Sequence, residues 1–299
     1  MSGADSAAGV TVAAPAKLNL YLHILGRRDG YHILDSLIAF ADCCDLVTAS
    51  PGDKLGLRVK GPFGEALDGD DDNLVLRAAR GLADMAGLAP RARLVLNKRL
   101  PVAAGIGGGS ADAAAALRAL CTLWDVQPDT DQLQALALSL GADVPVCLDG
   151  RARFVGGVGE DLEPAPTLPA AGLVLVNPGQ PLSTPEVFGA RAGAFSSGGR
   201  FETAPTDAAA LCALLEKRDN DLTEAAIRLV PAITDVLSEL AATKDCLLAR
   251  MSGSGATCFG IYQGSARARS AAERLSKRRP EWWVATGRLH DDCREIAGV

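Results

Sequence analysis

Residues 101–110 constrain the fold of this chain more than any other segment. They read Pro-Val-Ala-Ala-Gly-Ile-Gly-Gly-Gly-Ser and lead directly into Ala-Asp-Ala-Ala-Ala-Ala. Glycines at 105, 107, 108 and 109 allow successive backbone N–H groups to converge on one point. Ser110 is expected to cap a helix whose buried face carries Ala113, Leu117 and Leu120. Such a loop, at the positive end of a helix, is predicted to hold phosphate.

Two familiar phosphate-binding loops do not fit this segment. A Walker A loop requires a lysine after its last glycine, whereas Gly109-Ser110 is followed by Ala111. A dinucleotide-binding fingerprint that starts at Gly105 requires glycine at position 110, where the chain has serine. A glycine-rich turn without any ligand is the plainer alternative, but the alanine-rich helix that follows favours anion binding.

Length and charge limit the classes of protein to consider. The 299 residues are enough for two domains, and the formal net charge of −6 argues against a nucleic-acid partner. No apolar run approaches the ~20 residues of a membrane helix, and the segment before Pro15 does not resemble a secretory leader, so we expect a cytoplasmic protein without a membrane partner. The 8 cysteines form no CxxC pair, which makes cysteine-bound metal improbable.

Residues 15–25 alternate between apolar and polar side chains, which predicts a strand. One face, expected to be buried, carries Ala16, Leu18, Leu20, Leu22 and Ile24. The other face, expected to border an open surface or a cleft, carries Lys17, Asn19, Tyr21 and His23. A solvated strand lysine is the plainer alternative for Lys17 alone.

Asp143 is unusual for its surroundings. It follows a predicted helix over 131–140 and precedes the apolar residues 144–148, which we interpret as a strand. A carboxylate in such a place is unfavourable unless it is paired or used, although backbone amides could satisfy it. Lys17 is the candidate partner.

The remaining pattern interleaves strands with helices and predicts an α+β fold of two domains, residues 1–163 and 164–299. Residues 156–160 and 164–169 are interpreted as the connection, and the Gly-, Ala- and Ser-rich residues 189–205 as a mobile segment. Further helices are predicted over 74–86, 207–217, 222–229, 233–242 and 266–279, and strands over 45–49, 55–60, 94–97, 173–177, 246–251, 258–262 and 283–289.

Three segments together resemble the GHMP kinases, a superfamily of small-molecule kinases: residues 15–20, 101–114 and 252–257. Within it, the chain is most similar to the branch that acts on a cytidyl diphosphate methylerythritol, through Asp29-Gly-Tyr-His, Gly141-Ala-Asp-Val-Pro and Asn220-Asp-Leu. The resemblance implies two α/β sandwiches with the site in the cleft between them. It also implies ATP with Mg²⁺, and a monomer or homodimer.

The resemblance assigns candidate site residues position by position. It implies that ATP phosphates lie against Pro101, Val102, Ala103, Ala104, Gly105, Ile106, Gly107, Gly108, Gly109 and Ser110. It implies catalytic roles for Lys17 and Asp143, and substrate contacts for Asn19, Tyr31, His32 and Phe188. Metal ligands stay unassigned, because Ala111 stands where the family often has a second serine.

The implied reaction moves the γ-phosphoryl group of ATP to the 2-hydroxyl of the methylerythritol moiety, in the non-mevalonate route to isoprenoids. Asp143 would accept the hydroxyl proton, and Lys17 would stabilise its charged form. Two alternatives remain open. One is a GHMP kinase acting on mevalonate, homoserine or a sugar; the other is a nucleotide-binding regulator without catalysis, which leaves the presence of both Lys17 and Asp143 unexplained.

Overall fold

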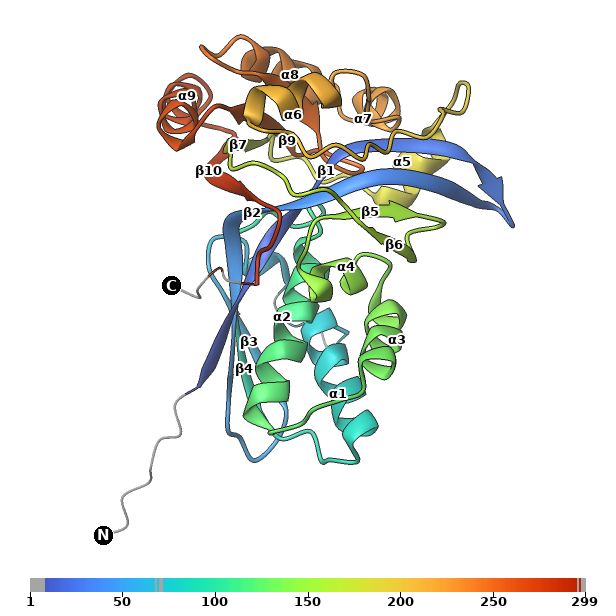
Figure 1. The fold of residues 1–299 in the computed structure, drawn as a ribbon. Helices are drawn as coiled ribbons and strands as arrows, with labels where there is room; N and C mark the ends of the chain where they lie inside the picture. The colour runs from blue at the N-terminus through green and yellow to red at the C-terminus, as the bar shows by residue number, and fades with distance from the viewer. Residues whose placement is uncertain (1–8, 68, 70–71, 295, 297–299) are drawn as a thin grey trace.

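A long antiparallel hairpin connects the two lobes of the protein (Figure 1). This computed structural model describes residues 9–67, 69, 72–294 and 296. The first eight residues, which begin the segment that does not resemble a secretory leader, lie outside the described part. The hairpin strands β1 (Val10–Arg28) and β2 (Tyr31–Ser50) pair along their whole length. The turn between them is Asp29-Gly30, both residues having positive φ. The predicted short strands at 15–25 and 45–49 are therefore parts of two much longer ones.

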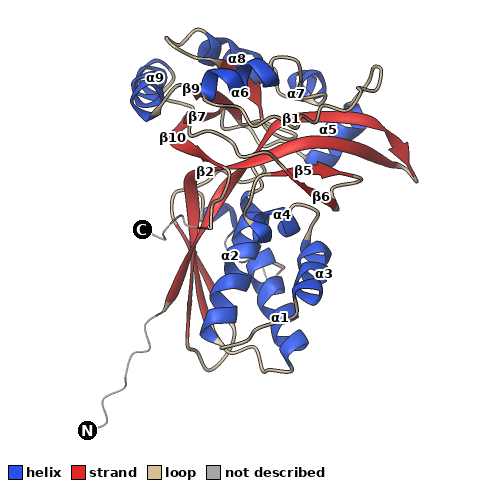
Figure 2. Cartoon of the chain, viewed as in Figure 1, coloured by secondary structure: helices blue, strands red, loops and turns tan. Residues whose placement is uncertain are grey.

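The N-terminal lobe packs helices against one face of a sheet (Figure 2). Its other strands are β3 (Gly56–Lys60), β4 (Arg93–Asn97), β5 (Arg153–Gly156) and β6 (Asp161–Pro164). Its helices are a short 3₁₀ turn (Glu65–Leu67), α1 (Leu74–Ala86), α2 (Gly108–Leu123), α3 (Thr130–Leu140) and α4 (Val144–Asp149). β4 and β5 both pair with β2. The alanines of α2 allow this helix to lie in the centre of the lobe core, against α1 and β1.

The C-terminal lobe places helices over a second set of strands. The strands are β7 (Gly172–Asn177), β8 (Leu248–Met251), β9 (Cys258–Tyr262) and β10 (Trp283–His290). The helices are α5 (Thr184–Ala190), α6 (Ala208–Leu215), α7 (Thr223–Leu229), α8 (Ala232–Ala241) and α9 (Ser265–Arg278). The α+β class is confirmed.

The two lobes share strands and core. β10 pairs with β7 over six residues and then with β2 through Leu289 and His290, so the strands form one continuous sheet. One buried cluster combines Leu18 and Leu20 of β1 with Leu173 of β7 and Phe259 of β9. The boundary at residue 163 stays a prediction, and β1 and β2 contribute to the cores on both sides of it.

Helix ends show how local sequence sets the elements around the site. The Asn73 side chain accepts a hydrogen bond from Val75 N–H and caps α1, whose bounds match the helix predicted over 74–86. The predicted cap at Ser110 is wrong, because α2 begins at Gly108 with Gly107 as its N-cap. Gly107 has φ 62°, which glycine adopts without the strain of a Cβ atom, so the helix starts within the glycine run.

Three other sequence predictions are corrected. Residues 144–149 form α4 and not a strand, because Pro145 fits the first turn of a helix, where its missing N–H has no partner to lose. The expected connection over 156–160 is the turn between β5 and β6. Residues 189–205, expected to be mobile, are fastened to the hairpin: Gly199 N–H donates to Asp35 Oδ2 at 2.5 Å and His23 Nδ1 lies 2.9 Å from Ser197 O.

The polar face of β1 is also more enclosed than expected. Both faces of the strand are buried over residues 13–24, so Tyr21 is fully buried and His23 is 7% exposed. Burial and the neighbouring Asp35 carboxylate raise the pKa of Tyr21 above its usual range. Only the first part of this face, at Lys17 and Asn19, borders a cavity.

Candidate active site

A cavity of about 580 Å³ lies where the two lobes meet. It is bordered by β1 and β2, the glycine loop over 101–110, the start of α1, the start of α4, the turn after β5, the loop over 252–257, and α5. Of the predicted site residues, it is lined by Lys17, Asn19, Pro101, Val102, Ala103, Ala104, Gly105, Gly107, Gly108, Gly109, Ser110, Asp143 and Phe188. Ile106 is completely buried beneath the loop, where its side chain anchors the glycines above it.

Lys17 and Asp143 meet at the edge of this cavity. Lys17 Nζ lies 2.9 Å from Asp143 Oδ2, although the residues are 126 positions apart. The lysine side chain is 5% exposed, whereas the aspartate side chain is 42% exposed. Lys17 N–H also donates to Ile106 O at 2.9 Å, which fixes β1 against the glycine loop. The pair therefore combines an enclosed cation with a carboxylate that a bound molecule can reach.

The glycine loop directs backbone amides into the cavity. The first hydrogen bond of α2 is donated by Ala111 N–H to Gly107 O, so the N–H groups of residues 108–110 precede the helical pattern. A Cβ atom on Gly107 would lie 3.1 Å from Lys17 Cβ, so the close approach of loop and strand requires glycine there. Amides at a helix N-terminus are a suitable site for phosphate oxygens.

Ala111 does not face these amides. It is 2% exposed and packs in the core of the N-terminal lobe, and it does not line the cavity. A serine at this position would direct its hydroxyl into the core. The departure from the family pattern therefore leaves the face of the loop that lines the cavity unchanged.

A buried ion cluster, which the sequence did not predict, lies beneath the glycine loop. Lys98 Nζ lies 2.6 Å from both Asp45 Oδ2 and Asp112 Oδ2, and all three residues are nearly inaccessible. Asp45 also accepts hydrogen bonds from Arg99 N–H and Leu100 N–H, which precede the loop. Asp112 belongs to α2, so the cluster joins the two ends of the loop. The sequence contains two signals for this cluster. One is the carboxylate of Asp45 within an apolar run, and the other is the carboxylate of Asp112 within an alanine-rich helix.

The pKa values of Asp112 and Lys98 in this cluster are both raised. Burial, and then the neighbouring Asp45, raise the pKa of Asp112 to about 7. Burial alone would lower the pKa of Lys98, but the two carboxylates outweigh it and raise the pKa above the ordinary value. Lys98 therefore stays charged below the loop, and it also lines the cavity.

A second glycine loop, over 252–257, closes one side of the site. Ser252 Oγ donates to Gly105 O at 3.0 Å, and Thr257 N–H donates to Ala104 O at 3.1 Å. Asn220 holds this loop from below, since its Nδ2 donates to Met251 O and Gly253 O, both at 2.8 Å. The loop over 252–257 therefore contacts the glycine loop over 101–110 directly.

Comparisons with known proteins show which family the chain belongs to. Residues 73–151 match the family described as GHMP kinases N terminal domain, and residues 204–281 match GHMP kinases C terminal. The 4-diphosphocytidyl-2-C-methyl-D-erythritol kinase of Paramagnetospirillum magneticum is 55% identical over 93% of this chain and 98% of that protein. The protein of the same name from Rhodospirillum rubrum is 50% identical over 97% of this chain and 96% of that protein.

The chain belongs to the 4-diphosphocytidyl-2-C-methyl-D-erythritol kinase family. A crystal structure of a 4-(cytidine 5'-diphospho)-2C-methyl-D-erythritol kinase superposes with a TM-score of 0.74 and 37% identity, over 93% of this chain and 98% of that one. A homoserine kinase from Cytophaga hutchinsonii has a TM-score of 0.70 at 18% identity, over 98% of this chain and 96% of that one, which shows a shared fold.

Two of the residues expected to contact the substrate, Tyr31 and His32, lie outside the cavity that Lys17 and Asp143 border. Tyr31, at the hairpin tip, is 68% exposed, and neither Tyr31 nor His32 lines the cavity. The His32 ring lies 5.3 Å from the Phe188 ring, centroid to centroid, and Phe188 does line it. Burial, then the nearby Arg27 and Arg191, lower the pKa of His32, so its imidazole is neutral at pH 7.

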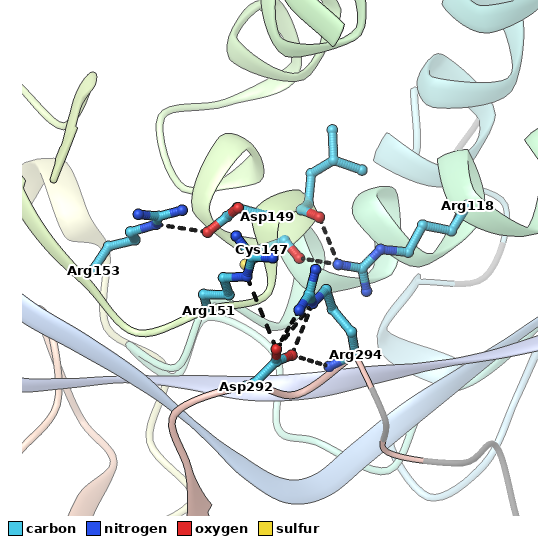
Figure 3. Close-up of polar contacts among 8 residues, drawn as sticks. Arg118, Cys147, Asp149, Arg151, Arg153, Asp292 and Arg294 are labelled. Carbon is cyan, nitrogen blue, oxygen red and sulfur yellow. Dashed lines mark hydrogen bonds and ion pairs between the residues drawn. The ribbon is translucent and has the colours of Figure 1, made fainter. Parts of the chain in front are cut away.

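In this kinase, Arg118 connects α2 to the last turn of α4, the helix that follows Asp143. Arg118 of α2 donates through Nη2 to the carbonyl oxygens of Cys147 (3.2 Å) and Leu148 (2.6 Å), in the last turn of α4 (Figure 3). The helix that begins at the glycine loop thus holds the far end of the helix that begins after Asp143. Around it, Figure 3 also shows the ion pairs of Arg151 and Arg294 with Asp292, and of Arg153 with Asp149.

Three further observations concern the rest of this kinase. A second cavity, of about 570 Å³, is bordered by Arg191, Glu224 and Arg250 and contains none of the predicted site residues. Among the described residues, no helix has the length and apolar character needed to cross a membrane. Within the same residues, no three His, Cys, Asp or Glu side chains gather as a metal site would require.

Proposed function

We propose that the chain transfers the γ-phosphoryl group of ATP to the 2-hydroxyl of 4-diphosphocytidyl-2-C-methyl-D-erythritol, in the non-mevalonate route of isoprenoid synthesis. The observation that carries the proposal is the Lys17–Asp143 pair, joined at 2.9 Å, at the edge of a cavity lined by loop amides. Phosphoryl transfer depends mainly on alignment and charge stabilisation, and this arrangement supplies both.

Asp143 is the proposed general base. Its side chain is 42% exposed, so an alcohol oxygen can approach the carboxylate. Two N–H bonds of the Lys17 ammonium are used by Asp143 and Asn19, at 2.9 and 3.0 Å, and the third is available to a phosphoryl oxygen. Lys17 would thus stabilise both the ionised base and the charge on the transferred group.

Mg²⁺ would be held mainly by the triphosphate. The cavity offers Asp143 and the Ser110 hydroxyl as oxygen ligands from the protein, which suits an ion that retains water and binds few carboxylates. When bound, Mg²⁺ neutralises charge on the β- and γ-phosphates. The amides of residues 108–110, with Lys98 behind them, would hold the same phosphates.

The cytosine end would bind toward the hairpin tip and α5. Phe188 provides a ring at the cavity wall, and the neutral His32 beside it can exchange hydrogen bonds with the edge of a base. Tyr31, exposed at the tip, is free to close over the other face of the base. Binding energy from this remote group would hold the reacting hydroxyl near Asp143.

The test is ATP consumption with the cytidyl acceptor beside free methylerythritol, mevalonate and homoserine. We expect turnover with the cytidyl acceptor alone; turnover with one of the others instead would overturn the substrate assignment. Asp143→Asn is expected to lower kcat by ~10²–10⁴-fold, as loss of a general base usually does. The exposed Asp84→Asn on α1 serves as the matched control and should retain wild-type kcat. Wild-type kcat in Asp143→Asn would remove this carboxylate from the mechanism.

A further inference from the structure

Ser36 is connected through Asn19 to Lys17, the residue proposed to act on the phosphoryl group. It belongs to β2, is 2% exposed, and lines the cavity opposite Leu22 of β1. Its hydroxyl donates to Tyr21 O at 2.5 Å and accepts from Asn19 Nδ2 at 2.8 Å. No substrate role is implied for it by the family motifs, which end at His32 in this part of the chain.

The single hydroxyl proton of Ser36 gives this network a direction. A serine hydroxyl has one donor, and here the Tyr21 carbonyl, which can only accept, takes it. Toward Asn19, Ser36 Oγ can therefore only accept. Asn19 must present its NH₂ group to Ser36 and its carbonyl oxygen, Oδ1, to the other side. The orientation of this amide thus follows from the chemistry of its neighbours.

Lys17 lies on that other side. Its Nζ donates to Asn19 Oδ1 at 3.0 Å and to Asp143 Oδ2 at 2.9 Å. If the Asn19 amide were reversed, an NH₂ group would face the ammonium, and Lys17 would lose one of its two acceptors. Lys17 is 4% exposed, so solvent cannot readily replace that acceptor.

We propose that Ser36 is a positioning residue for phosphoryl transfer: by fixing the amide of Asn19, it holds the Lys17 ammonium beside Asp143 with one N–H directed to the cavity. The inference rests on the proposed function. It also predicts a specific requirement at position 36, namely a hydroxyl that donates to one neighbour and accepts from another. Threonine meets this requirement and alanine does not.

Steady-state kinetics of Ser36→Ala and Ser36→Thr test the proposal. Ser36→Ala is expected to lower kcat by about tenfold, the effect of one lost buried hydrogen bond, with the KM for ATP changed by less than about twofold. Ser36→Thr should retain kcat within about threefold. Ser139→Ala on α3, which removes a hydroxyl that bonds Leu136 O far from the cavity, is the matched control. Wild-type kcat in Ser36→Ala would overturn the proposal.

A double-mutant cycle separates positioning from a general structural role. If Ser36 acts through Asn19, then Ser36→Ala should change kcat by less than about twofold in an Asn19→Ala background. An equal loss in both backgrounds would show that Ser36 does not act through Asn19. If Ser36→Ala does not fold, Ser36→Cys replaces it in the double-mutant cycle, because the cysteine sulfur is only a weak acceptor. The same changes in kcat are then expected, and the same result would refute the proposal.

A measurement without turnover keeps this result distinct from the proposed function. In ¹⁵N-labelled wild-type protein, the two Asn19 side-chain amide protons are expected to give resolved signals that exchange slowly with solvent, because one of them is donated to buried Ser36. Ser36→Ala should accelerate that exchange by tenfold or more, and unchanged exchange would refute the orientation argument. Absence of turnover in wild-type protein would instead refute the proposed substrate.

Discussion

The contact between the two glycine loops gives the sharpest test of the site, through Gly105→Ala. Gly105 has φ +73°, and a Cβ atom there would lie 2.6 Å from Gly255 N, Gly255 O and Ser252 O. All three atoms belong to the backbone, so no side-chain rotation can relieve the overlap. The alanine must therefore move the two loops apart. This movement breaks the 3.0 Å hydrogen bond from Ser252 Oγ to Gly105 O.

The expected cost combines two effects. An L-residue held in a left-handed conformation costs roughly 1 kcal/mol, and overpacking against fixed neighbours costs roughly 1–3 kcal/mol. Gly105→Ala should therefore lower the free energy of unfolding by about 2–4 kcal/mol. Gly109→Ala is the matched control: its Cβ would meet only Leu74 Cδ1, at 3.5 Å, and alanine in the first turn of α2 favours the helix by up to ~1 kcal/mol.

The assay is denaturant-induced unfolding of both variants without ligand, followed by the KM for ATP of Gly105→Ala. We expect a large decrease in stability for Gly105→Ala and none for Gly109→Ala, and an increased KM for ATP in the former because its loop amides are displaced. If the two variants have equal stability, the loops do not meet as described, and the geometric account of the phosphate site fails.

Two further predictions concern groups at opposite ends of the site. Tyr31→Ala removes a side chain that is 68% exposed, so the free energy of unfolding should not change. The KM for the cytidyl acceptor should rise and the KM for ATP should stay constant. An unchanged KM for the acceptor would contradict the base-stacking role. Asp112 has a pKa of about 7 in the folded protein, so the folded state binds its proton more tightly than the unfolded state, and the free energy of unfolding should fall as pH rises from about 4 to 7. Asp112→Asn should flatten that dependence in denaturation measured at pH 5 and pH 8, and an identical slope in both proteins would contradict it.

The elements that could be predicted from sequence are those whose signals are local. The helix over 74–86, the glycine-rich loop at the start of α2 and the strand over 15–25 depend on neighbours within a few residues. The placement of Lys17 beside Asp143 was also predictable, because a carboxylate at position 143 was unfavourable without a partner and Lys17 was the candidate partner.

The features that escaped prediction depend on distant parts of the chain. A short apolar run such as 144–148 fits a strand or a buried helix equally well, and only its packing against α2 and α3 decides between them. Tyr21 looked exposed by alternation because the lobe that covers it is encoded mostly after residue 170. The Lys98 cluster unites positions 45, 98 and 112, and no periodicity connects residues at such separations.

The strand that joins both lobes restricts how the cleft can open. Leu289 and His290 of β10 pair with β2 directly after the same strand has paired with β7. A rigid-body rotation of one lobe about a hinge would break these backbone bonds and expose the apolar cluster behind them. We therefore expect nucleotide and acceptor to enter and leave through local rearrangement of the hairpin tip and α5, with the distance between the lobes nearly constant throughout the catalytic cycle.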